Sequence, residues 1–153
     1  MYRLHVKAHF DAAHYIKDYQ GKCSRMHGHR WGVEVVLEGS KLGPMNMLVD
    51  FSWVKKRLEG LLGDLDHYVV NERLPKLTQY GEADNVTAEY LAKWIYCCFE
   101  AFMIHPDVSE RETFGGRLYL KGNGVYEWSG VTLVSVAVWE SPDCCVEYYG
   151  EKA

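Results

Sequence analysis

The amino-terminal segment alternates strictly between apolar and polar residues, and this pattern constrains the fold more than any other feature. In residues 3–10 every second residue is apolar, and those between them are arginine, histidine or lysine. A period of two predicts a half-buried strand, which we expect to run on towards His14. A polar loop over residues 15–30 and a second strand at residues 31–38 should follow. The two strands are then expected to pair antiparallel as a long, irregular hairpin.

Two segments further along the chain have the pattern of amphipathic helices. Residues 51–62 place leucines and a valine on one helical face, with lysines and an arginine opposite. A second helix is expected to extend from a cap at Asn85 or Thr87 to about residue 103. Its apolar stripe predicts packing against a sheet.

Two more strands complete the expected fold. Residues 131–139 are apolar on both faces, which predicts a strand buried on both sides, and residues 145–149 look like its partner. The order β-β-α-α-β-β predicts an α+β fold, an antiparallel sheet covered on one side by two helices. A chain of 153 residues without repeats or linkers suggests a single domain. We interpret the Gly-rich, polar residues 104–129 as an inserted excursion, with a hairpin between 117–121 and 125–128.

Composition excludes several classes of protein. The net charge of −4 is mild and no cluster of Lys and Arg is present, which argues against nucleic-acid binding. No apolar run approaches the roughly 18 residues that a membrane span needs, and the amino terminus does not read as a signal peptide. The five cysteines include the neighbouring pairs Cys97–Cys98 and Cys144–Cys145, which we expect to be small buried side chains. This usage favours a reducing cytoplasm over a secreted disulfide framework.

The segment from Cys23 to His29 carries the strongest chemical signal. His27 and His29 are two residues apart, so in an extended backbone both rings leave the same face. Histidine is the commonest neutral zinc ligand, and the hairpin should bring His14 back towards them. Three histidines without an obvious fourth ligand suggest an open, catalytic Zn²⁺ site. Spacing leaves Cys23 open as either a fourth ligand or a reactive thiolate.

Two further positions are weaker candidates. Asp66 precedes His67, and a carboxylate beside an imidazole can orient it for acid–base chemistry, although a helix-end cap is the simpler interpretation of this pair. Glu140 ends an otherwise apolar strand, where a carboxylate either leaves for solvent or binds a ligand.

Six short motifs, taken in order, resemble the 6-pyruvoyltetrahydropterin synthase family. These motifs are Phe10-Asp-Ala-Ala-His14, Cys23-x-x-x-His27-Gly-His29, Val49-Asp50-Phe51, Leu65-Asp66-His67, Asn85-x-Thr87-Ala-Glu89 and Glu140-Ser-Pro142. The three residues between Cys23 and His27 look like the branch that forms 6-carboxytetrahydropterin for queuosine and other deazapurines. The chain departs from the family at Val86, often proline there, at Arg30-Trp31 and in its longer excursion.

The resemblance implies the tunnelling fold, whose protomers assemble through their sheets into barrels, commonly as hexamers with active sites at subunit boundaries. It implies that His14, His27 and His29 bind Zn²⁺ and that Cys23 is the proton acceptor. His67 and Glu140 would complete the proton relay, and Asp66 would orient His67. Glu140 would also bind the amino-pyrimidine end of the pterin, with Thr87 near the same end.

The implied reaction converts 7,8-dihydroneopterin triphosphate to 6-carboxy-5,6,7,8-tetrahydropterin, releasing triphosphate and acetaldehyde. One alternative is 6-pyruvoyltetrahydropterin synthesis from the same substrate. A second alternative, from a different class, is a non-catalytic pterin-binding protein stabilised by zinc.

Overall fold

A four-stranded antiparallel sheet forms the centre of the structure, a computed structural model that describes residues 1–77, 85–104, 113–114, 117–118 and 130–151. The strand order is β1-β2-β5-β6. These strands are β1 (Tyr2–His14), β2 (His27–Gly39), β5 (Val131–Ser141) and β6 (Cys144–Tyr148). The helices are α1 (Phe51–Gly63), α2 (Val70–Arg73) and α3 (Ala88–Ile104), with short 3₁₀ turns at Lys22–Ser24, Pro44–Asn46 and Leu74–Lys76.

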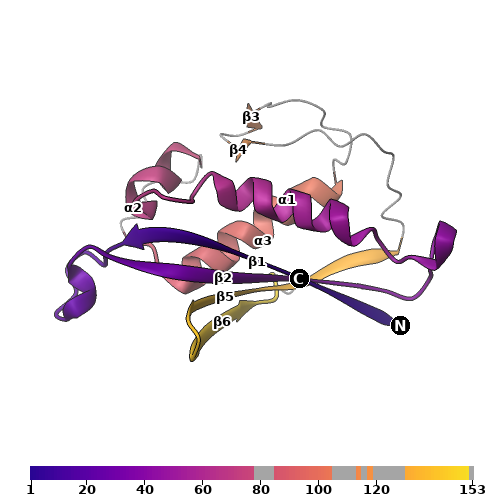
Figure 1. The fold of residues 1–153 in the computed structure, drawn as a ribbon, viewed down its shortest axis with the longest axis horizontal. Coiled ribbons are helices and arrows are strands. Elements are labelled where there is room, and N and C mark those ends of the chain that lie inside the picture. The colour runs from indigo at the N-terminus through magenta and orange to yellow at the C-terminus, as the bar shows by residue number, and fades with distance from the viewer. Residues whose placement is uncertain (78–84, 105–112, 115–116, 119–129, 152–153) are drawn as a thin grey trace.

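The helices lie on one face of the sheet (Figure 1). Helix α1 packs along β1, and α3 lies against β5 and β6. The core between the two layers is built of leucine, valine and aromatic side chains from every one of these elements. The predicted α+β architecture with an antiparallel sheet is therefore confirmed, and α2 is a short helix that the sequence did not indicate.

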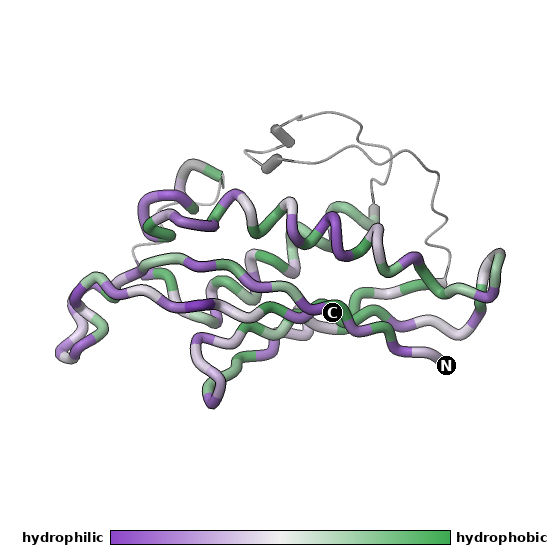
Figure 2. The backbone as a smooth tube through the Cα atoms, in the orientation of Figure 1, coloured by the Kyte–Doolittle hydropathy of each residue, from purple (hydrophilic) through white to green (hydrophobic). Residues whose placement is uncertain are grey.

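The alternation in the amino-terminal segment becomes the alternation of burial along β1. Figure 2 shows the matching change of hydropathy along the strand. Strand β1 pairs antiparallel with β2 over its whole length, from Tyr2 opposite Gly39 to His14 opposite His27. The prediction that the second strand begins at residue 31 was wrong, because β2 begins four residues earlier. The segment His27-Gly28-His29 has no alternation of apolar and polar residues, and the sequence therefore predicted a loop there. Its backbone nevertheless continues the antiparallel pairing of β2 with β1.

Both long helices begin at capping residues. The carboxylate of Asp50 accepts a hydrogen bond of 2.7 Å from the N–H of Ser52 at the start of α1. At the start of α3 the hydroxyl of Thr87 accepts one of 3.3 Å from the N–H of Tyr90. Of the two predicted caps, Thr87 therefore has this role, while Asn85 has a different one, described below.

Strand β5 is buried on both sides in its middle part only. Val136 and Val138 face the helices and are fully buried, and on the opposite face Ser135 and Ala137 are 0% and 3% exposed. The hydroxyl of Ser135 donates to the carboxylate of Glu147 in the neighbouring strand, 2.6 Å away. The prediction of a doubly buried strand thus holds for residues 135–138, and its two ends are partly exposed.

The cysteine pairs differ from each other. Cys98 is buried, as predicted, whereas Cys97 is only half-buried. Cys144 and Cys145 are exposed, so the prediction that this second pair is buried was wrong. These two residues begin β6 directly after a turn, and β6 is an edge strand of the sheet.

The proposed excursion at 104–129 falls largely outside the described residues. Within it, Thr113–Phe114 (β3) pairs with Arg117–Leu118 (β4). The predicted hairpin partner at 125–128 lies outside the part of the chain that the structure describes. Among the described residues, no helix is both long enough and apolar enough to cross a membrane.

Candidate metal centre

The hairpin of β1 and β2 brings three histidines onto one face of the sheet. His14 and His27 are directly opposite each other across the two strands, and His29 is two residues further along β2. Cross-strand partners and residues two apart on one strand share a face. The ring centroid of His14 lies 4.5 Å from that of His27 and 5.3 Å from that of His29, and the centroids of His27 and His29 are 4.9 Å apart. The convergence expected from the hairpin is present.

Backbone carbonyls determine which nitrogen of two of these rings faces the centre. The Nδ1 of His14 lies 2.7 Å from the carbonyl oxygen of Val86, and the Nδ1 of His27 lies 2.7 Å from that of Arg25. A carbonyl oxygen only accepts hydrogen bonds, so each Nδ1 must carry the hydrogen. The neutral rings therefore present a free lone pair at Nε2, and carbonyl partners of this kind orient histidine ligands in metal sites.

The Nε2 atoms of all three histidines are buried and have no hydrogen-bond partner. Unpaired buried polar atoms are costly, and three that converge on one point fit a bound cation. Burial lowers the pKa of His29, which favours the neutral ring, against the opposing effect of Glu140. Imidazole nitrogens of this kind suit zinc among the common metals. The residues present therefore fit a Zn²⁺ ion.

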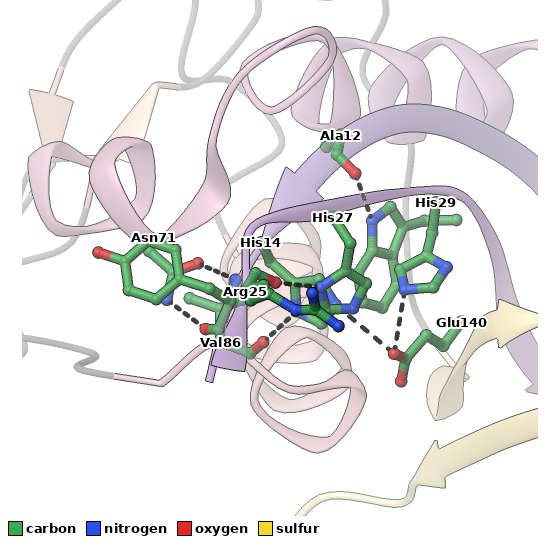
Figure 3. Close-up of polar contacts among 10 residues, drawn as sticks. Ala12, His14, Arg25, His27, His29, Asn71, Val86 and Glu140 are labelled. Carbon is green, nitrogen blue, oxygen red and sulfur yellow. Dashed lines mark hydrogen bonds and ion pairs between the residues drawn. The ribbon is translucent and has the colours of Figure 1, made fainter. Parts of the chain in front are cut away.

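A carboxylate from the third strand joins this cluster. Glu140 lies near the end of β5, one residue beyond the pair of Gly32 with Trp139 that joins β5 to β2. Its Oε1 lies 3.2 Å from the Nε2 of His29 and 3.5 Å from the Nε2 of His14. One ligand atom from each histidine and from Glu140 lies within 4.8 Å of every other. Figure 3 shows the carboxylate turned towards the imidazoles, so Glu140 does not leave the strand for solvent.

An indole ring covers the inner side of the cluster. Trp31 is completely buried, and its ring meets those of His14 and His29 edge-on at centroid distances of 4.8 and 5.4 Å. Its Nε1–H donates to the carbonyl oxygen of Ala12 over 3.3 Å, and Phe10 stacks against it. The buried indole therefore forms the wall of the cluster on the side of the hydrophobic core.

Cys23 lies in the loop between β1 and β2, at the 3₁₀ turn Lys22–Ser24. Its side chain is half-buried, and its carbonyl oxygen accepts a hydrogen bond of 2.8 Å from the N–H of Ile16. The thiol is not a member of the four-residue group of ligand atoms. The structure therefore places Cys23 near the root of the loop but not among the converging ligands.

Two asparagine side chains clamp this loop to the rest of the protein. The carboxamide of Asn71 accepts from the N–H of Tyr15 over 3.0 Å and donates to its carbonyl over 2.9 Å. The carboxamide of Asn85 likewise accepts from the N–H of Lys17 over 2.5 Å and donates to its carbonyl oxygen over 3.3 Å. Sequence reasoning missed both clamps, because each joins residues more than fifty positions apart and Asn85 resembles a helix cap.

We expect Asn71→Leu to lower the free energy of unfolding by about 1–3 kcal/mol. Leucine has a similar shape but leaves the N–H and C=O of Tyr15 without partners in a site where Asn71 is only 7% exposed. Urea denaturation measures the loss, and a chromogenic disulfide reagent should react faster with Cys23 in the variant. Asn85→Leu is the matched control, with a smaller loss because its contacts are exposed to water. An Asn71→Leu protein as stable as the wild type would contradict this role.

Asp66 and His67 form a pair next to the edge of β1. The Nδ1 of His67 lies 2.9 Å from a carboxylate oxygen of Asp66, whose other oxygen accepts from the N–H of Asp11 over 2.8 Å. The Asp11 N–H is the main cause that lowers the pKa of the Asp66 carboxyl. His67 has a φ of 63°, in the left-handed region that few residues other than glycine adopt. The backbone of the pair has a helix-end role as well, because just beyond α1 the N–H of Asp66 donates to the carbonyl oxygen of Leu62 over 3.0 Å.

The imidazole of His67 remains outside the histidine cluster. Its side chain is 79% exposed, and it is not in the group of four ligand residues. Both His67 and His29 line a groove of about 490 Å³ that also includes Arg30, whose guanidinium makes two hydrogen bonds to Asp11. Thr87 is occupied by capping α3. The structure thus brings the three histidines and Glu140 into one group of ligand atoms, of which Cys23 and His67 are not members.

Comparisons with known proteins identify the family of this chain. The family model for 6-pyruvoyl tetrahydropterin synthase matches residues 3–151. The 6-carboxy-5,6,7,8-tetrahydropterin synthase of Bacillus subtilis is 33% identical over 103 residues, which are 67% of this chain and 68% of the relative. The dihydroneopterin monophosphate aldolase of Pyrococcus furiosus is 36% identical over 94 residues, 61% of this chain and 70% of the relative.

The fold also resembles that of a solved structure. The 6-pyruvoyl tetrahydropterin synthase of Caenorhabditis elegans superimposes with a TM-score of 0.68 at 19% identity, covering 98% of this chain and 96% of that one. With the six motifs in order and a family match over nearly the whole chain, this chain belongs to the 6-pyruvoyl tetrahydropterin synthase family, whose members are lyases that act on pterins.

Proposed function

We propose that the protein converts 7,8-dihydroneopterin triphosphate to 6-carboxy-5,6,7,8-tetrahydropterin, releasing triphosphate and acetaldehyde. The observation that carries the proposal is the convergence of three unpaired Nε2 atoms from His14, His27 and His29 in a chain of this family. Relatives named 6-carboxy-5,6,7,8-tetrahydropterin synthase, such as those of Bacillus subtilis and Synechocystis, favour the carboxy product. We place this activity in the queuosine branch of deazapurine biosynthesis and in the cytoplasm. We also propose that the whole chain folds as a single domain.

The three histidines would hold Zn²⁺, which supplies Lewis-acid polarisation of the substrate side-chain hydroxyls. Cys23 acts as a thiolate base and removes a proton from a side-chain carbon. The shift of double bonds that follows reduces the pterin ring, and triphosphate leaves by elimination. The position of Cys23, outside the ligand group, supports a base over a fourth ligand.

The remaining residues bind the pterin and move protons. Asp66 holds the His67 ring through Nδ1, which leaves Nε2 free to exchange protons with the substrate. Glu140 would pair with the amino-pyrimidine edge of the pterin, since a carboxylate accepts two parallel N–H bonds. Thr87 would lie near the same end, with its hydroxyl hydrogen still able to donate.

A second copy of the chain would complete the site. His67 is highly exposed, and the outer edge of β6 pairs with no other described strand. Unpaired sheet edges readily add a strand from another copy. We propose that protomers join through their sheets into a barrel, as a homohexamer, with the relay of Asp66 and His67 near a subunit boundary.

Product analysis by mass tests the proposed reaction. Incubation of the zinc-loaded protein with dihydroneopterin triphosphate should release triphosphate and acetaldehyde in equal amounts, with the carboxy product in the same yield. A product that keeps its three-carbon side chain would assign pyruvoyl synthesis instead. A protein that binds the substrate but releases no triphosphate is a zinc-stabilised binding protein.

The aldolase of Pyrococcus furiosus provides a second candidate function, because its identity to this chain, 36%, exceeds that of the two 6-carboxy-5,6,7,8-tetrahydropterin synthases named above. An aldolase cleaves a carbon–carbon bond of the side chain and leaves the phosphate on the smaller fragment. The same assay run with dihydroneopterin monophosphate separates the two activities: an aldolase consumes the monophosphate without releasing inorganic phosphate.

A further inference from the structure

One oxygen of Glu140 lies close to two imidazole nitrogens. Its Oε1 is 3.2 Å from the Nε2 of His29 and 3.5 Å from the Nε2 of His14 (Figure 3). The proposed role of this carboxylate at the pterin does not require such an approach. The reason for it must therefore be sought in the histidine cluster itself.

A direct hydrogen bond does not explain the approach. The carboxylate of Glu140 is within hydrogen-bonding distance of the Nε2 of His29, yet this nitrogen has no hydrogen-bond partner. The angle between the two groups is therefore unsuitable for a hydrogen bond. The Nε2 of His14 presents a lone pair, because its Nδ1 donates to Val86. A lone pair and a carboxylate 3.5 Å apart repel each other beside a completely buried ring, unless a positive charge lies between them.

The two distances from Glu140 match the edges of a zinc tetrahedron. Bonds of about 2.0–2.1 Å at tetrahedral angles place neighbouring ligand atoms about 3.3 Å apart. The measured separations of 3.2 and 3.5 Å lie on either side of this value. Ligand atoms of a shared ion face the ion and not one another, which also accounts for the unsuitable hydrogen-bond direction.

We infer that Glu140 is the fourth protein ligand of the resting metal centre, and that it must be displaced before the diol of a pterin side chain can bind. This inference rests on the proposed zinc site. The exchange moves no proton and no electron, since a neutral hydroxyl enters and a carboxylate leaves. In the resting protein the centre is closed by Glu140, and the freed carboxylate becomes available to the pterin only after substrate enters.

Cobalt substitution of the full chain provides the test, because the visible bands of Co²⁺ report its ligands and their number. The proteins compared are the wild type, Glu140→Ala, Glu140→Gln as an isosteric variant and His27→Ala. Asp143→Asn is the matched control, since it removes an exposed carboxylate from the turn that follows β5. Circular dichroism checks that each variant is folded, and chelator competition gives the Co²⁺ affinity.

Both Glu140 variants should bind Co²⁺ at least about tenfold more weakly and show altered bands, while Asp143→Asn matches the wild type. Acetate should restore the wild-type bands to Glu140→Ala and leave the wild type unchanged. Neopterin, which carries the hydroxylated side chain without phosphate, should change the wild-type bands.

Each other outcome has one meaning. Wild-type bands in the folded Glu140→Ala and Glu140→Gln proteins, without a response to acetate, would overturn the inference while leaving the zinc site intact, even if the affinity fell. A wild-type chain that binds no Co²⁺, or His27→Ala that binds it equally well, would instead overturn the metal site on which the proposed function depends.

Discussion

Cys23→Ala should retain one zinc ion per chain and lose turnover by about 10²–10⁴-fold, the usual contribution of a general base. The physical reason is the position of the thiol outside the converging ligands, so its removal takes away a proton acceptor and leaves the imidazoles in place. Zinc content by elemental analysis and release of triphosphate measure the two effects on one preparation.

Cys97→Ala is the matched control for this variant, because Cys97 is half-buried like Cys23 but lies in α3. It should keep both zinc and turnover. A Cys23→Ala protein that loses its zinc together with its turnover would show that the thiol is a ligand, and the proposed chemistry would then be wrong. Full turnover with zinc retained would remove Cys23 from the reaction altogether.

His27→Ala is expected to lose zinc and turnover together, the latter by more than about a thousandfold. The metal would keep only two imidazoles beside the carboxylate of Glu140, and the loss of one of the three converging Nε2 atoms weakens zinc binding directly. His27 is a better choice than His14, since His14 is completely buried and its removal would also open a cavity in the core. Zinc stoichiometry and triphosphate release again report the result.

His9→Ala tests whether the effect belongs to the cluster. His9 is an exposed histidine of β1, on the face of the sheet opposite His14, and should be silent in both assays. Retention of zinc and turnover by His27→Ala would exclude this residue from the site. Loss of both by His9→Ala would show that the measured effect is a general one on folding.

Much of the fold could be predicted because its signals are local. The alternation of residues 3–10 and the helical face of residues 51–62 each depend on neighbours in the chain, and both correspond to observed elements. The start of β2 could not be found in this way, since histidine and glycine show no apolar period. Helix α2 has four residues, too short for a periodic pattern.

The site was predictable only where a hairpin determines it. His14, His27 and His29 share one pair of strands, so their approach follows from antiparallel pairing. The approach of Glu140 depends instead on β5 docking beside β2, a contact between residues about a hundred positions apart. The positive φ of His67 could not be predicted either, because no glycine at or beside this position signals it.

Removal and return of zinc, followed by triphosphate release from dihydroneopterin triphosphate, tests the central claim most directly. The purified chain should contain one zinc ion, a strong chelator should abolish both the metal and the release, and stoichiometric Zn²⁺ should restore them together. Release that continues unchanged after the metal has been removed, or a chain that never binds zinc, would contradict the account.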